Sequence, residues 1–115
     1  MQPIDQATRA YRTAATHRSQ REQEADVFRR ASGALKIARD AEPMHRVQAI
    51  ADNRLLWTTV TDLMRDPLNA LPLDLRASIV SVGAAVQREM ERDVPDFDFL
   101  IAINEDIAAG LAEPV

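Results

Sequence analysis

The stretch IADNRLLWTTVTDLM, residues 50–64, decides the fold because its apolar residues recur at helical spacing. With a turn of about 100° per residue, they fall on one arc of a helix surface, made of Ile50, Leu56, Trp57, Val60, Leu63 and Met64. Asn53 lies near the centre of this arc, where a core-facing helix is normally apolar. The stretch therefore predicts a core helix with one amide on its packed face, and the role of that amide is structural, binding or catalytic.

The composition is that of a small helical domain. A chain of 115 residues suits one domain with one core. Its apolar fraction of 46% and charged fraction of 28% are those of a chain that folds. Three glycines and abundant alanine and arginine favour helix. The lack of cysteine excludes a disulfide scaffold, a thiol nucleophile and a cysteine zinc site.

The ends and the hydropathy give no sign of targeting to a membrane. The start, MQPIDQATRAYRTAATHR, lacks the apolar segment of a secretory signal. No apolar run approaches the roughly 18 residues of a membrane span. We therefore expect a cytoplasmic protein that makes no membrane contact.

Charge is divided unevenly along the chain. Residues 1–46 hold nine Lys/Arg and six Asp/Glu, whereas residues 47–115 hold five and twelve, for a net charge of −4. An acidic protein is a poor binder of nucleic acid, although the arginine-rich front half keeps that possibility open. The simpler interpretation is that these charges lie on solvated helix faces.

Five segments have helical periodicity, with signals at their ends. Residues 19–22 form a capping-box pattern, and Pro43 fits the first turn of a helix. Pro95 ends one segment, and Asp96 is a good N-cap for the next. We predict an all-α single domain over residues 1–115, a compact bundle of about five helices whose last three form the main core. The predicted helices are residues 5–16, 19–38, 43–65, 72–93 and 97–112.

A second amide, Asn104, lies at the centre of the apolar stripe of the last helix. A buried amide must find partners or cost about 1–3 kcal/mol. Asn53 and Asn104 are therefore expected to bond to each other, to a loop backbone or to water, and to fix how their helices meet. The alternatives are contact with the backbone of a partner chain, or catalysis. Trp57 is expected in the core, because a lone tryptophan within a helical apolar stripe is usually buried; if exposed, it would instead anchor a partner.

Two helices carry a further apolar strip. On the fourth helix this strip lies about 150° from the main stripe, so the helix is either packed on both sides or partly exposed for a partner. It consists of Leu73, Ala77, Val80 and Ala84. The last helix adds Phe99, Ile103 and Gly110. Two such strips on neighbouring helices would form a groove for an amphipathic helix, and we take them as candidate partner-binding residues, apart from Gly110.

The sequence offers no positive sign of catalysis. His17 and His45 each stand alone, without a ligand at metal-binding spacing. No zinc-protease, phosphate-loop, nucleophile-elbow or dinucleotide motif is present. An acidic cluster lacks the spacing and the glycine of a calcium loop; it consists of Glu89, Glu91, Asp93, Asp96 and Asp98. We therefore predict no catalytic residues, no metal site and no cofactor.

Three motifs in order resemble the FlaF family of alphaproteobacterial flagellar biosynthesis proteins: DNRLLWT at 52–58, LPLDLRASIVSVG at 71–83 and FLIAINEDIAAGL at 99–111. The resemblance covers nearly the whole chain. One departure is Ala85, where many relatives carry a large aromatic residue. Ile103 also matches the family pattern. The other matching positions are expected to be structural, and they are Asn53, Arg54, Trp57, Leu71, Pro72, Leu75, Arg76, Asn104, Gly110 and Leu111.

The resemblance implies a small cytoplasmic helical protein needed to make and export flagellin. Members look like flagellin-specific secretion chaperones, and they are linked to the control of flagellin translation in opposition to the FlbT family. The expected partner is thus flagellin, through its amphipathic terminal segments, with a FlbT-like regulator as a further one. The alternatives are a structural adaptor among flagellar proteins, or a regulator that contacts flagellin messenger RNA through Arg9, Arg12, Arg18, Arg21, Arg29 and Arg30.

Overall fold

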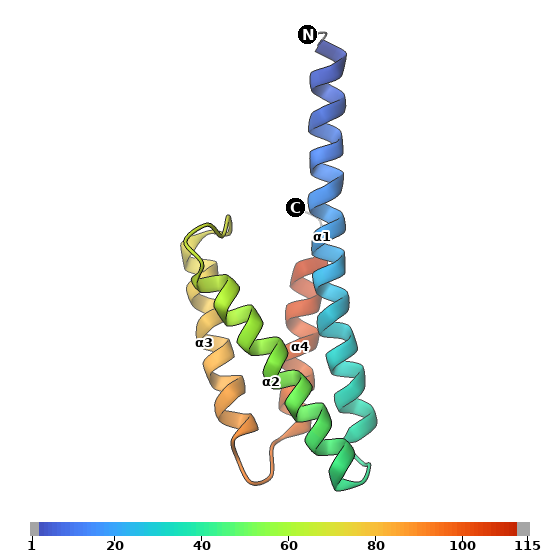
Figure 1. Ribbon diagram of the computed structural model, residues 1–115, viewed down its shortest axis with the longest axis vertical. Coiled ribbons are helices and arrows are strands. Elements are labelled where there is room, and N and C mark those ends of the chain that lie inside the picture. Colours follow the sequence, from blue (N-terminus) through green and yellow to red (C-terminus); the bar gives the residue numbers. More distant parts are fainter. Residues whose placement is uncertain (1–2, 113–115) are drawn as a thin grey trace.

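The computed structural model describes the backbone of residues 3–112 and, within it, the side chains of residues 5–13 and 20–112. This part of the chain is all-α, as predicted (Figure 1). It holds no strand, and its helices are α1 (Pro3–Ala38), α2 (Pro43–Arg65), α3 (Leu73–Met90) and α4 (Phe97–Ala112).

The helix boundaries follow the predicted signals at most positions. α2 and α4 match their predicted ranges. The backbone N–H of Phe99 donates to Asp96 Oδ1 at 3.1 Å, so Asp96 caps α4 as expected. α3 is shorter than predicted and ends at Met90 rather than at residue 93. The turn that follows carries Pro95, which disfavours helix at the residue before it.

The first two predicted helices are one continuous helix, α1. Ser19 lies inside α1, so the capping-box pattern there does not begin a helix, and the side chains of His17 and Ser19 lie outside the described residues. Neither proline nor glycine occurs between Pro3 and Gly33, and the intervening Ala, Arg, Gln and Glu residues favour helix. A local capping signal therefore loses to uninterrupted helix propensity.

Successive helices run in alternating directions, and they form two side-by-side pairs (Figure 1). α1 lies along α4, and α2 lies along α3. α1 and α2 also contact each other, which joins the two pairs. α3 and α4 make no extended contact. A closed four-helix bundle has four such contacts, so this bundle is open along the seam between α3 and α4.

α1 is longer than the bundle. Its 36 residues span about 54 Å, against about 24 Å for the 16 residues of α4. Figure 1 shows the N-terminal half of α1 standing clear of the other helices. Residues 5–13 are all exposed, and the first buried residue in the described part of α1 is Ala25. The core is therefore built by the chain from Ala25 onward.

The core draws on all four helices, so the prediction that the last three form the main core was incomplete. α1 contributes Ala25, Phe28, Leu35 and Ala38 because it lies along α4. Trp57 is fully buried, as expected, and its ring meets Phe28 edge-on at a centroid distance of 5.7 Å. Two ion pairs hold α1 to α4 at the surface, Lys36–Glu105 and Arg39–Asp98.

Candidate functional site

A chain of buried polar side chains crosses the bundle. The Trp57 indole N–H donates to Asn104 Oδ1 at 2.9 Å, and Asn104 Nδ2 donates to Asn53 Oδ1 at 2.7 Å. Asn53 Nδ2 then donates to the Met90 sulfur at 3.4 Å. None of the four residues is more than 3% exposed. This confirms the prediction that the two amides are buried and hydrogen-bonded, and it shows that, of the three expected kinds of partner, they bond to each other.

The direction of this chain is fixed by its first donor. An indole N–H can only donate, so Asn104 must turn its carbonyl oxygen toward Trp57 and its amino group toward Asn53. These hydrogen bonds link α2, α3 and α4. They lie where α4 has no extended backbone contact with α2 or α3. They therefore set the spacing and the rotation at which the two helix pairs meet.

Two arginines of the family motifs bond to the carbonyl ends of helices. Arg76, in the first turn of α3, donates to the carbonyl oxygens of Met64 at 2.8 Å and Asp66 at 3.0 Å. Arg54, in the middle of α2, donates to the carbonyl oxygen of Met90 at 3.3 Å. Helix C-termini carry unpaired carbonyls and partial negative charge, so each arginine stabilises the end of the neighbouring antiparallel helix.

Gly83 lets α3 approach α2 closely, a role that the sequence analysis did not assign. A Cβ built at Gly83 would lie 2.9 Å from Thr61 Oγ1 and 3.2 Å from Trp57 Cε3. The Trp57 ring is fully buried and cannot move aside freely. An isolated glycine inside a helical pattern was the available signal, since such a residue costs about 1 kcal/mol against alanine unless packing needs it.

Gly83→Ala is therefore expected to lower the free energy of unfolding by about 1–3 kcal/mol, because the added methyl overpacks the α2–α3 contact. Gly110→Ala is the matched control, since nothing lies within 4 Å of a Cβ there. The control should be neutral or stabilise the helix by about 0.5–1 kcal/mol. Urea unfolding followed by circular dichroism measures both. Equal effects of the two substitutions would contradict the close approach.

The remaining motif residues are dispersed. Leu71 is half-buried and its backbone N–H is bonded to the Asn69 side chain, whereas the exposed Pro72 is the N-cap residue of α3. Leu75 is 46% exposed. On α4, Gly110 is exposed and Leu111 is half-buried.

The predicted partner-binding residues lie in two separate places. On α3, Leu73, Ala77 and Ala84 are exposed and Val80 is half-buried. Val80 and Ala84 line a surface groove of about 270 Å³ together with residues of α2, namely Thr58, Thr61, Asp62 and Arg65. The α3 strip therefore borders α2, and it does not join Phe99 and Ile103 of α4 in one groove.

A different apolar flank of α3 faces the open seam. Helical geometry places Leu75, Ile79 and Val82 on the flank opposite the Val80–Ala84 groove. Ile79 and Val82 are half-buried against the edge of the core. On α4, Phe99 is 37% exposed and Ile103 and Ile107 are half-buried. The seam is thus bordered by apolar side chains that neither helix covers completely.

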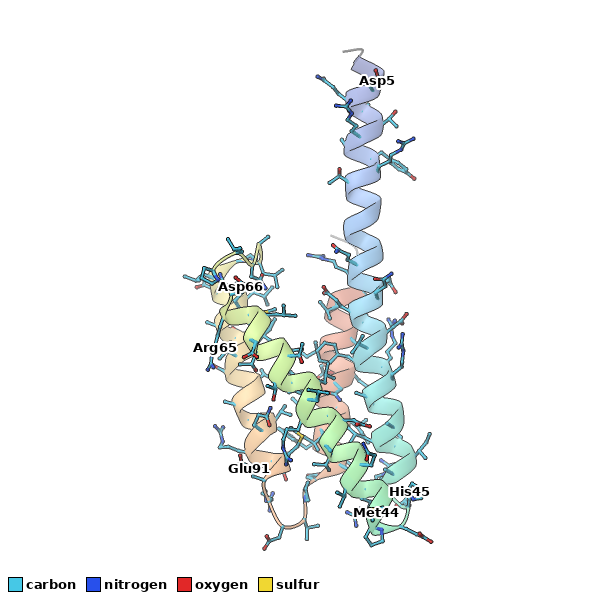
Figure 2. All side chains as sticks on the ribbon, viewed as in Figure 1. Asp5, Met44, His45, Arg65, Asp66 and Glu91 are labelled. Atoms are coloured by element: carbon cyan, nitrogen blue, oxygen red, sulfur yellow. The ribbon has the colours of Figure 1, made fainter. Side chains whose placement is uncertain are left out.

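Three members of the acidic cluster, Glu89, Asp96 and Asp98, have structural partners. Glu89 pairs with Arg92 at 3.2 Å and accepts the backbone N–H of Asp96 at 2.9 Å. Asp98 pairs with Arg39 of α1. No group of metal-binding side chains occurs among the described residues. His45 is exposed at the start of α2, next to Met44 (Figure 2).

A comparison with known protein families shows the family to which the chain belongs. The family model described as "Flagellar protein FlaF" matches residues 7–111. No match was found among curated proteins or among solved structures. Within the described part of the chain, no helix is long and apolar enough to cross a membrane. Since the matched segment includes all three motifs and the buried polar chain between Asn53 and Asn104, the protein belongs to the FlaF family of flagellar proteins.

Proposed function

We propose that this protein binds flagellin in the cytoplasm and supports its synthesis and export for filament assembly. Membership of a flagellar family supports the flagellar part of this proposal. The observation that carries the binding part is the open seam between α3 and α4, which leaves apolar side chains incompletely covered on both helices.

The physical basis is the burial of an amphipathic helix. The terminal segments of flagellin are amphipathic, so an unassembled monomer exposes apolar faces. A fifth helix laid along the seam would cover Leu75, Ile79 and Val82 on α3 together with Phe99, Ile103 and Ile107 on α4. Such helix-in-groove recognition suppresses premature association of the bound segment. Release before export requires a modest interface, of about 1,600 Å² or less.

Charge reversal of exposed seam residues tests the proposal. Leu75→Glu and Phe99→Glu each place a carboxylate against the apolar helix face, and we expect flagellin binding to weaken tenfold or more, about 1.4 kcal/mol. Both residues are partly exposed, so the fold should survive. The matched control is Leu55→Glu on α2, a leucine that is 69% exposed and lies away from the seam.

Calorimetric titration of purified flagellin into each variant measures the affinity, and circular dichroism checks the fold. Unchanged affinity in both seam variants would show that flagellin binds elsewhere or not at all. Binding lost equally in Leu55→Glu would show a general effect of negative charge.

The alternative functions rest on weaker observations. Arg9 and Arg12 are exposed on the projecting half of α1, where a regulator of flagellin messenger RNA would make phosphate contacts. Tyr11 is the single aromatic residue nearby for base stacking. A FlbT-like regulator as partner and an adaptor role are further alternatives. RNA contact through α1 does not need the seam, so Leu75→Glu and Phe99→Glu separate it from flagellin binding.

A further inference from the structure

A cleft of about 400 Å³ lies at the end of the bundle opposite the loop that follows Arg65. It is formed by the N-terminal half of α2 and the connection from α3 to α4. Figure 2 shows Met44 and Glu91 at this end and Asp66 at the other. The cleft is distinct from the seam, and it adjoins the polar chain at Met90, which belongs to both. Its lining residues play no part in the proposed binding of flagellin.

The walls of the cleft are largely apolar. Ile50, Met90 and Phe97 are buried core residues that contribute their surfaces to it. Val47 and Val94 also line it, although they are 65% and 72% exposed. A pocket of this size is within the range that holds a small molecule or the end of a chain, and its walls favour an apolar body.

The charged residues of the cleft oppose the charge of the chain. Arg46, Arg54 and Arg92 line it, against the single carboxylate of Asp93. The whole chain carries −4, and residues 47–115 hold only five basic residues. Two of those five are Arg54 and Arg92. The acidic cluster of Glu89, Glu91, Asp93, Asp96 and Asp98 lies in and beside the connection from α3 to α4, so the attraction of an anion rests on direct contact with Arg46 and Arg54 and not on the net charge around the cleft.

Arg46 is held in place yet lacks an acceptor. Its guanidinium lies over the Phe97 ring, 5.2 Å from the ring centroid, which fixes its plane. Its Nε is buried, and no acceptor for it exists among the described residues. Arg54 is oriented by its bond to the Met90 carbonyl and retains further N–H donors. A buried donor without a partner costs free energy. Because Nε itself is enclosed, a ligand in the cleft would accept from the terminal N–H groups of the Arg46 guanidinium.

We propose that this cleft binds a carboxylate attached to an apolar group. The carboxylate accepts from Arg46 and Arg54, whose planar forks match its geometry, and the apolar group rests on Ile50, Met90 and Phe97. Two sources carry this chemistry: the C-terminal end of a polypeptide with an apolar last residue, and an acyl chain. Arg92 is partly neutralised by Glu89 and contributes little to this attraction.

Four probes test the ligand chemistry on the wild-type protein: N-acetyl-leucyl-leucine, its C-terminal amide, octanoate and inorganic phosphate. Backbone amide shifts of the cleft residues in NMR titrations report binding. The two carboxylates should bind at least tenfold more tightly than the amide and the phosphate. Tighter binding of the peptide than of octanoate assigns the site to a chain end, and the reverse order assigns it to an acyl chain. Equal binding of the acid and the amide would overturn the proposal.

Substitutions test which residues of the cleft bind the carboxylate. Arg46→Gln should weaken carboxylate binding at least tenfold, and Arg88→Gln on the exposed face of α3 is the matched control. Val47→Glu and Val47→Lys both replace an exposed rim valine by a long charged side chain, so the difference between them reports the sign of the charge. This comparison holds even where Arg46→Gln disturbs the fold. The glutamate should weaken binding and the lysine should preserve or strengthen it. Unchanged affinity in both Arg46→Gln and Val47→Glu would overturn the proposal.

Discussion

Trp57→Ala is expected to lower the free energy of unfolding by about 3–5 kcal/mol, one of the two largest single effects in this protein. The indole is fully buried, meets Phe28 edge-on and lies under Gly83. Its removal leaves a large cavity at the junction of the helix pairs, and it also deprives Asn104 Oδ1 of its donor. The loss therefore combines packing with an unpaired buried acceptor.

Two further variants divide this loss. Trp57→Phe retains an aromatic ring but removes the indole N–H and some buried volume. The unpaired Asn104 acceptor alone should cost about 1–3 kcal/mol, and most of the packing should survive. Leu55→Ala, at an exposed position of the same helix, should stay within about 0.5 kcal/mol of the wild type. Urea unfolding is followed by circular dichroism, because Trp57 is the single tryptophan. A loss in Trp57→Ala no larger than in Leu55→Ala would contradict its core role.

Asn104→Ala is expected to have the other large effect, because it leaves two neighbours unpaired. The Trp57 N–H loses its acceptor and Asn53 Oδ1 loses its donor. Each unpaired buried group costs about 1–3 kcal/mol. Asn53→Ala should cost less, because its other partner is the weak sulfur acceptor of Met90.

A double-mutant cycle tests whether the two amides act as one unit. The Asn53→Ala/Asn104→Ala variant should lose less stability than the sum of the single variants, since the second substitution removes a group that the first left unpaired. Flagellin binding should weaken only in proportion to unfolded protein. A fully folded single variant that loses binding tenfold would instead make its amide a direct contact to flagellin.

Periodicity predicted the features that depend on a single helix. It predicted the ranges of α2 and α4, and it singled out Asn53 and Asn104 because an amide at the centre of an apolar stripe needs a partner. The sequence left open whether the two amides bond to each other, to a loop backbone or to water, and the structure shows that they bond to each other. The predictions from periodicity succeeded because burial of one helix face is a local property of the sequence.

The periodicity of a single helix does not encode features that depend on how helices meet. Periodicity shows that α3 has apolar flanks but not which flank borders α2, so Val80 and Ala84 were placed with Phe99 although they line a groove with Thr58 and Thr61. The open seam depends on the separation of α3 from α4, which no local pattern encodes. The cleft that contains Arg46, Arg54 and Arg92 likewise combines residues that precede α3 in the sequence with residues that follow it.

The projecting half of α1 gives the helix an unusual thermodynamic character. An isolated helix must form a costly nucleus before it can grow, whereas residues 25–38 of α1 are already fixed by the core. Each further turn toward Pro3 then requires only propagation of an existing helix, without a new nucleus. On heating, these turns unfold one after another, starting from the end near Pro3. Helix content and core stability are therefore separate quantities in this protein, and a melting curve of total ellipticity adds a gradual fraying process to a cooperative one.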